Sequence, residues 1–210
     1  MHIAEGVLSA QVLTAGAGIA IVGTALGLKN LQIDKLLMTG VLAAFFFIAS
    51  LVHIPIGFSS AHLIGNGLLG IFLGLGAFPA ILAALLLQAL LLHFGGITVL
   101  GVNTATMALG AYLAKLIYTL ALKLYPNPRG LKVAGFLAGV TGVLTSALLT
   151  SIALTFTEEG FVAAAYALVL AHIPIMLAEG LICMLIVTFV AKMQPEYLNL
   201  PANFQMKVAR

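Results

Sequence analysis

Residues 163–191 read AAAYALVLAHIPIMLAEGLICMLIVTFVA, and Glu179 is the one charged side chain among them. A helix needs about 20 consecutive apolar residues to cross the hydrocarbon core of a bilayer, so this stretch is long enough to span a membrane. The whole chain has the same character, because 62% of its 210 residues are hydrophobic and 7% are charged. Soluble domains carry roughly 25% charged residues. The sequence therefore predicts an integral membrane protein with no soluble domain.

Seven apolar segments, separated by glycine, proline or charged connectors, are candidate transmembrane helices. They lie at about residues 10–28, 36–54, 62–75, 80–93, 104–124, 133–156 and 163–191. The third and fourth are short, and Gly74, Gly76 and Pro79 separate them. We expect an all-α, polytopic helical bundle in the cell membrane, with residues 1–210 forming one integral membrane domain. Because no Lys or Arg precedes the first apolar segment, we expect that segment to be retained rather than cleaved as a signal peptide.

The basic residues predict the orientation of this bundle, because cytoplasmic loops hold an excess of Lys and Arg. With seven spans, an outer N-terminus and an inner C-terminus put the basic loop residues on the cytoplasmic side: Lys29, Lys35, Lys123, Arg129, Lys132, Lys192, Lys207 and Arg210. All five histidines then lie in the outer half, which indicates a cation site that opens outward. The net charge of +3 is spread over these loops, so we expect no nucleic-acid partner.

The first two residues, Met1 and His2, carry the groups of a metal chelate. A free N-terminal amine, the amide nitrogen of His2 and its imidazole Nδ1 can bind one ion with three nitrogens in one plane. A fourth nitrogen completes a square-planar set, which favours Ni(II) or Cu(II). His62 is the candidate for this ligand, because it begins a predicted span on the same side as Met1. A lone histidine at either position is more often an ordinary polar residue, so the prediction depends on their combination.

Four residues further along the chain are candidates for a supporting role around the metal. His172 and Glu179 lie seven residues apart and so share one helix face, and ionisable groups inside a span by default mark function. A structural hydrogen bond between helices explains Glu179 equally well. Asn66 and Asn103 can hydrogen-bond the backbone of an inserted terminal segment, and each is equally well an ordinary helix cap. The glycine-containing loop at 95–101 is expected to line the entrance of the site.

Several features are absent from the sequence or occur once. It has no Walker phosphate-binding loop, no HExxH and no GxSxG motif, so we expect no enzyme activity and no organic cofactor, and ATP-driven transport would need partner subunits. The single cysteine, Cys183, excludes an internal disulfide and is expected to pack as a small hydrophobe. Small residues such as Gly16 and Ala20 in the first span allow close helix contacts, within the bundle or with a partner.

Four segments of the chain form a recognisable set: MHIAEG at 1–6, SSAHLIGNGLLGIFLG at 59–74, LLLQALLLHFGGITVLGVNTATMALG at 85–110 and HIPIMLAEG at 172–180. Together they resemble the CbiM/NikM family, the substrate-binding components of energy-coupling factor (ECF) transporters for cobalt and nickel. The resemblance implies that Ni²⁺ or Co²⁺, carried as substrate, is held by Met1, His2 and His62, with residues 1–9 inserted in the bundle. Many relatives differ at positions 4–5, so Glu5 is assigned a supporting role only.

The resemblance also implies partners: a transmembrane coupling subunit, cytoplasmic ATPases and a small membrane accessory subunit. Two rival functions stay open from the residues alone. The first is a stand-alone, proton-coupled transporter of divalent metals with His172 and Glu179 as a proton relay, which metal uptake into liposomes under a pH gradient without ATPases would support. The second is an intramembrane enzyme or sensor, which the lack of a nucleophile motif disfavours.

Overall fold

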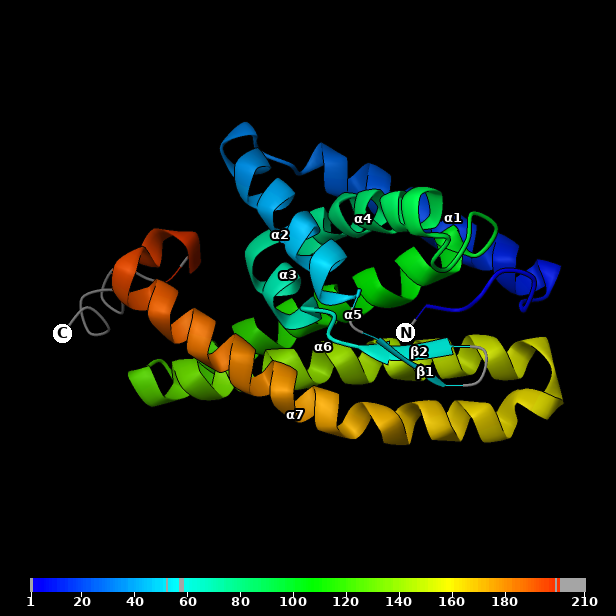
Figure 1. Cartoon of the computed structure of the whole chain (residues 1–210). Helices are drawn as coiled ribbons and strands as arrows, with labels where there is room; N and C mark the ends of the chain where they lie inside the picture. The colour runs from blue at the N-terminus through cyan, green and yellow to red at the C-terminus, as the bar shows by residue number, and fades with distance from the viewer. Residues whose placement is uncertain (1, 52, 57–58, 199, 201–210) are drawn as a thin grey trace.

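The computed structural model describes residues 2–51, 53–56, 59–198 and 200 of the chain. It is mostly helical, at 82%, as the apolar segments predict. The described α-helices are α1 (Ala10–Lys29), α2 (Leu36–Ala49), α3 (Asn66–Leu73), α4 (Ala77–Leu92), α5 (Leu100–Leu124), α6 (Pro128–Thr157) and α7 (Val162–Met193). Short 3-10 helices η1 (Ile33–Lys35), η2 (Gly74–Gly76), η3 (Glu159–Phe161) and η4 (Pro195–Leu198) connect or follow them. Figure 1 shows α5, α6 and α7 as long rods beneath α1 to α4.

Five helical segments in the described part of the chain are long and apolar enough to cross a membrane. Four of them contain α1, α5, α6 and α7, and the fifth runs through α3, η2 and α4 from Asn66 to Leu92. The sequence predicts two separate spans in this last stretch, because its glycines resemble loop punctuation. Instead, Gly74 ends α3 with a left-handed φ of 57° and the chain resumes helix at once. Helix α2 has 14 residues, fewer than the about 20 that a span needs.

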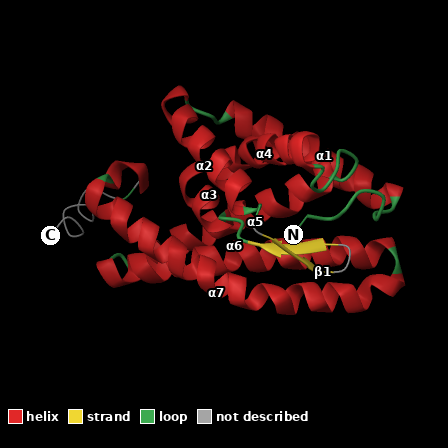
Figure 2. Ribbon diagram, viewed as in Figure 1, coloured by secondary structure: helices red, strands yellow, loops and turns green. Residues whose placement is uncertain are grey.

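A β-hairpin separates α2 from α3 (Figure 2). Strand β1 (His53–Ile56) pairs antiparallel with β2 (Ser59–His62), and His53 lies opposite His62. The sequence predicts helix up to residue 54 and a new helix at His62; both predictions are wrong. Pro55 favours an extended neighbour over a helical one, and β1 is extended. Helix α3 begins only after Gly65, whose φ of 73° is left-handed.

Small residues allow the long helices to lie close together. Helix α6 packs along both α5 and α7, and a Cβ on Gly139 of α6 would lie 2.5 Å from the carbonyl oxygen of Glu179. Gly16 of α1 faces Val102 of α5, where a Cβ would collide with the valine side chain. The small residues of the first span therefore pack within this bundle, as helices in lipid commonly do.

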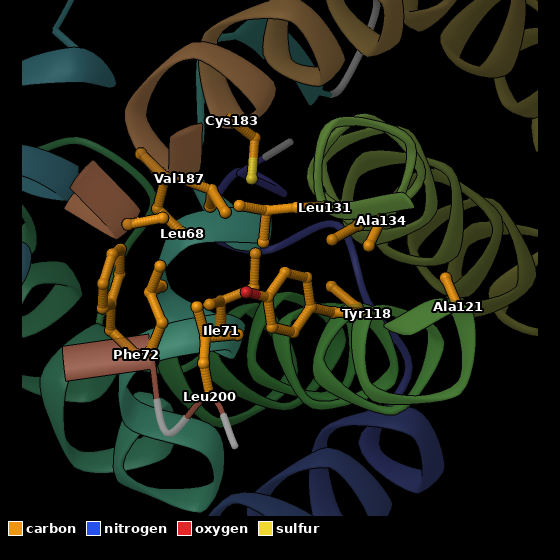
Figure 3. Packing of buried hydrophobic residues seen from close by; sticks show 14 residues of the cluster. Leu68, Ile71, Phe72, Tyr118, Ala121, Leu131, Ala134, Cys183, Val187 and Leu200 are labelled. Atoms are coloured by element: carbon orange, nitrogen blue, oxygen red, sulfur yellow. The ribbon is translucent and has the colours of Figure 1, made fainter. Parts of the chain in front are cut away.

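Apolar side chains fill much of the buried core, and large apolar side chains also cover the outer faces of the helices. Figure 3 shows one core cluster, in which Cys183 of α7 packs among residues such as Leu68 and Leu131. Cys183 is a buried free thiol, as the sequence predicts. On the outer face of α7, Leu185 and Phe189 are 63% and 64% exposed. Large exposed apolar faces are unfavourable in water and suit a bilayer, so the chain is a multi-pass membrane protein.

Candidate metal site

The terminal segment before α1 is held by one amide side chain. The backbone N–H of Ile3 donates to Asn103 Oδ1 at 3.0 Å, and Asn103 Nδ2 donates to the Ile3 carbonyl at 3.2 Å. Asn103 lies in the first turn of α5 and is 2% exposed, while Ile3 is fully buried. Because both polar groups of one terminal residue are paired, the segment has a fixed register along α5. The neighbouring His2 is 3% exposed, and Met1 lies outside the described residues.

The loop between α4 and α5 wraps around Glu5. The backbone N–H of Glu5 donates to the Gly95 carbonyl at 3.1 Å, and Glu5 Oε1 accepts from the Thr98 N–H at 3.3 Å. Gly96 has a φ of 145°, and a Cβ at that position would collide with the Glu5 carboxylate. The glycines thus permit this loop to approach the terminal segment closely.

Gln88 of α4 fixes the proton position on His2. Its Nε2 donates to the Phe47 carbonyl at 3.1 Å and to Ser50 Oγ. A carbonyl only accepts, so Oε1 is the Gln88 atom that faces His2, and it lies 2.8 Å from His2 Nε2. His2 Nε2 therefore carries the imidazole proton. In neutral His2, Nδ1 is then an unprotonated nitrogen with a free lone pair.

The same reasoning applies to His62 at the end of β2. Its Nδ1 lies 2.8 Å from the Leu63 carbonyl oxygen, so Nδ1 carries the proton and Nε2 has the free lone pair. His62 Nε2 lies 2.9 Å from His2 Nδ1. Two neutral imidazoles thus direct their lone pairs at each other. Such lone pairs repel unless a cation lies between them, and the cation is either a shared proton or a metal ion.

Burial disfavours a proton shared between His2 and His62. It lowers the pKa of both His2 and His62 well below the ordinary value of 6.5. Both imidazoles are therefore neutral at neutral pH, the protonation state in which they bind metals. Among the described residues, no group of three or more His, Cys, Asp or Glu side chains is arranged to hold a metal. A metal between His2 and His62 would therefore need ligands of another kind, such as backbone nitrogen.

The backbone N–H of His2 is available for this purpose. The hydrogen bonds of the described residues leave it without an acceptor, whereas the next N–H along the chain, that of Ile3, is paired with Asn103.

Phe94 closes the site on one side, because its ring centroid lies 4.1 Å from that of His2 and 4.3 Å from that of His53. His53 is exposed at the rim.

Glu179 of α7 reaches the segment that carries His62. Its Oε1 accepts from the backbone N–H of Gly65 at 2.8 Å and from that of Ile64. His172 is fully buried on the same helix, and its Nδ1 lies 2.7 Å from the Leu168 carbonyl oxygen. Its Nε2 has no hydrogen-bond partner among the described residues. The two residues thus face the bundle interior as predicted, but Glu179 contacts the backbone next to His62 rather than an imidazole.

Asn66 is fully buried in the bundle. Because His62 ends a strand, Asn66 does not share a helix with it and is the first residue of α3. Its Nδ2 donates to Ser146 Oγ of α6 at 2.7 Å, and within the described part of the chain it makes no hydrogen bond to the terminal segment. Of the five supporting residues expected from sequence, Asn103 and Glu179 contact the segments that carry the two histidines. Glu5 lies on the terminal segment itself and binds it to the loop between α4 and α5.

Comparison with known proteins identifies the family. The model of the CbiM family, described as the cobalt uptake substrate-specific transmembrane region, matches residues 2–197. The chain belongs to the CbiM family. A putative metal transport protein of Haemophilus influenzae is 39% identical over 97% of this chain and 100% of its own length. The cobalt transport protein CbiM of Kyrpidia tusciae is 35% identical over 97% of this chain and 88% of its own.

Two solved structures of transition metal transporters, one of them truncated, superpose on this CbiM chain. Their TM-scores are 0.78 and 0.79, each at 28% identity over 92% of this chain and over 99% and 93% of their own lengths. This CbiM protein is therefore a membrane component of cobalt uptake, a transport component rather than an enzyme.

The site residues predicted from the sequence of this CbiM chain do not include Gln88, Phe94 or His53, which the fold brings to the two histidines. Gln88 is the one amide in the apolar run of α4, and a polar residue inside a span is a signal of function. That signal could have identified Gln88 as a candidate. Nothing in the sequence links Phe94 or His53 to His2, because the hairpin and the loop bring them together only in the folded chain.

Proposed function

We propose that this CbiM protein captures Ni²⁺ or Co²⁺ as its transported substrate through four nitrogens. The ligands are the amine of Met1, the backbone nitrogen of His2, His2 Nδ1 and His62 Nε2. The observation that supports this set most strongly is the pair of opposed lone pairs, His2 Nδ1 and His62 Nε2, 2.9 Å apart. Each is fixed in its unprotonated form by a hydrogen bond at the other ring nitrogen, which is how proteins orient metal-binding histidines.

The distance between these nitrogens fits neighbouring corners of a square-planar site. With metal–nitrogen bonds of about 2.0 Å, adjacent ligands at a right angle lie about 2.8 Å apart. The amine of Met1 and the backbone nitrogen of His2 would occupy the other two corners. The His2 N–H has no acceptor among the described residues, which supports its use as a ligand. A planar set of four nitrogens suits Ni(II) better than Co(II), so we propose nickel as the better-held ion.

The remaining contacts support the ligands in this scheme. Gln88 orients His2, Asn103 and Glu5 hold the terminal segment, and Glu179 holds the backbone after His62. His172 and Asn66 would act through the packing of α6 and α7. Such partners of the ligands typically change metal affinity 10- to 100-fold when they are removed.

Transport in this proposal needs partner subunits. The sequence has no phosphate-binding loop for ATP, so cytoplasmic ATPases and a transmembrane coupling subunit of the ECF type would supply the energy, with a small membrane accessory subunit. The metal site faces outward and the basic loops face the cytoplasm, as the excess of Lys and Arg at one end of the bundle favours.

One added residue ahead of Met1 tests this ligand set. The extension displaces the amine from the chelate, so Ni²⁺ affinity measured by calorimetric titration should fall by more than the about 100-fold that loss of a supporting contact causes. The same residue added after Arg210 is the control and should leave the affinity unchanged. An N-terminally extended protein that binds Ni²⁺ as tightly as the original would overturn the amine ligand.

A further inference from the structure

A hollow of about 580 Å³ lies at the opposite end of the bundle from the two histidines. Its walls come from the segment after α1, from η2 and from the second half of α5. Asn103, near the metal site, and Lys123, at the hollow, are 20 positions apart on α5, which corresponds to about 30 Å along the helix axis. The hollow is therefore distinct from the metal site.

Among the described residues, the lining of this hollow contains three lysines and no carboxylate: Lys35, Lys115 and Lys123. We call it the lysine hollow. Lys35 and Lys115 are half-buried, and the charge of Lys35 acts repulsively on Lys115. Within the described part of the chain, no carboxylate forms an ion pair with any of the three. Like charges held together away from bulk water are unfavourable, and an anion between them would remove the repulsion.

The α5 wall of the hollow is amphipathic along its length. Lys115, Thr119 and Lys123 recur at four-residue spacing, which puts them on one helix face. Leu116 and Leu120, also in the wall, follow the polar positions by one residue and are 47% and 52% exposed. A ligand that fits this wall therefore has a compact negative group beside long apolar chains.

We propose that the lysine hollow binds the phosphate headgroup of an anionic glycerophospholipid, with the acyl chains along Leu116 and Leu120. The basic loops assign this end of the bundle to the cytoplasmic side, where the leaflet is rich in anionic lipid and basic pockets between helices bind lipid headgroups. Lys115 lies against Gly74, and a Cβ there would collide with its ammonium group. The bound lipid would thus brace the junction between α3 and α4.

Native mass spectrometry of the full chain, released from detergent micelles with equal amounts of phosphatidylglycerol and phosphatidylcholine, tests this proposal. The original protein should retain one phosphatidylglycerol in preference to phosphatidylcholine. The double variant Lys115→Gln/Lys123→Gln should bind it about 25-fold more weakly, because each basic residue near an anionic surface contributes a factor of about five. Unchanged Ni²⁺ binding at the far end will show that the variant is folded.

The matched control is Lys132→Gln/Lys192→Gln, which removes two lysines from a second hollow of about 300 Å³ beside α6 and α7. This control should retain the lipid. Equal loss of phosphatidylglycerol in both double variants would mean diffuse charge attraction and would overturn the proposed lipid site. Unchanged retention of phosphatidylglycerol in the Lys115 and Lys123 variant would overturn it as well. Two further results would overturn the choice of a lipid: displacement of phosphatidylglycerol by an equimolar amount of inorganic phosphate, or by an acidic peptide.

Discussion

Replacing Gln88 by Leu should weaken metal binding although Gln88 is not proposed to touch the metal. Gln88 is fully buried, and its Oε1 is the acceptor that holds the proton on His2 Nε2. Leucine is of similar size and cannot accept, so the His2 ring loses the bond that sets its orientation and keeps Nδ1 free for the ion.

The size of the effect follows from these contacts. Loss of a partner that orients a metal-binding histidine typically costs 10- to 100-fold in affinity, which is about 1.4 to 2.7 kcal/mol. Stability should fall as well, because the His2 Nε2–H is left buried without its acceptor, and such a group costs about 1–3 kcal/mol. The Phe47 carbonyl loses one donor but keeps the hydrogen bond from Ser50 Oγ. Both losses come from one hydrogen-bonded chain that runs from Phe47 through Gln88 to His2.

Calorimetric titration with Ni²⁺ and thermal unfolding of the metal-free protein separate the two effects. Ser151→Ala is the matched control, because Ser151 Oγ donates to the Ala165 carbonyl at 3.1 Å, a buried bond between α6 and α7 that does not involve either histidine. The control should lose stability and keep its affinity. If Gln88→Leu also kept the original affinity within about twofold, well inside the 10-fold minimum expected, Gln88 would not orient His2 and the reasoning would be refuted.

Two other results are expected. Asn103→Leu should weaken Ni²⁺ binding and speed hydrogen exchange at the Ile3 amide, because the N–H and carbonyl of Ile3 lose their partners at about 1–3 kcal/mol each. Asn103→Asp keeps the acceptor for the Ile3 N–H, so its affinity and exchange rate should be intermediate. Equal affinity and exchange in the two variants would contradict this role of Asn103. Burial lowers the folded-state pKa of His2 and His62 below 6.5. Below pH 6.5 the unfolded chain therefore binds more protons than the folded chain. The stability of the metal-free protein should then fall as the pH drops from about 7 to about 5. Thermal unfolding over this range should show the slope, and the variant His2→Ala/His62→Ala should show a smaller one.

Long uniform features of the sequence predict the fold best. Helices α1, α5, α6 and α7 coincide with long apolar segments, since a span is fixed by the length and apolarity of a local stretch. The hairpin was not predictable in this way, because strands of four residues are stabilised by each other and by what covers them. The joining of α3 and α4 into one span was not predicted for a different reason. A glycine such as Gly74 is typical both of a loop between two spans and of a bend within one span, so the sequence does not distinguish them.

The candidate site was predictable where its chemistry is local. The pairing of a histidine with the preceding amine is visible at positions 1–2, and His62 was a candidate from its place in the expected topology. Its true setting is a strand end, not a helix start. Gln88 and His2 are 86 residues apart, and the value of their contact depends on which ring nitrogen carries the proton. Only the folded arrangement reveals that the two lone pairs oppose each other.

X-ray absorption spectroscopy of the nickel-loaded protein, with its native first residue free, tests the central claim most directly. The account predicts a metal shell of four nitrogens at about 2.0 Å with two imidazoles in it, and one imidazole fewer in His62→Ala. A shell dominated by oxygen or sulfur, or a two-imidazole signal that persists in His62→Ala, would contradict it.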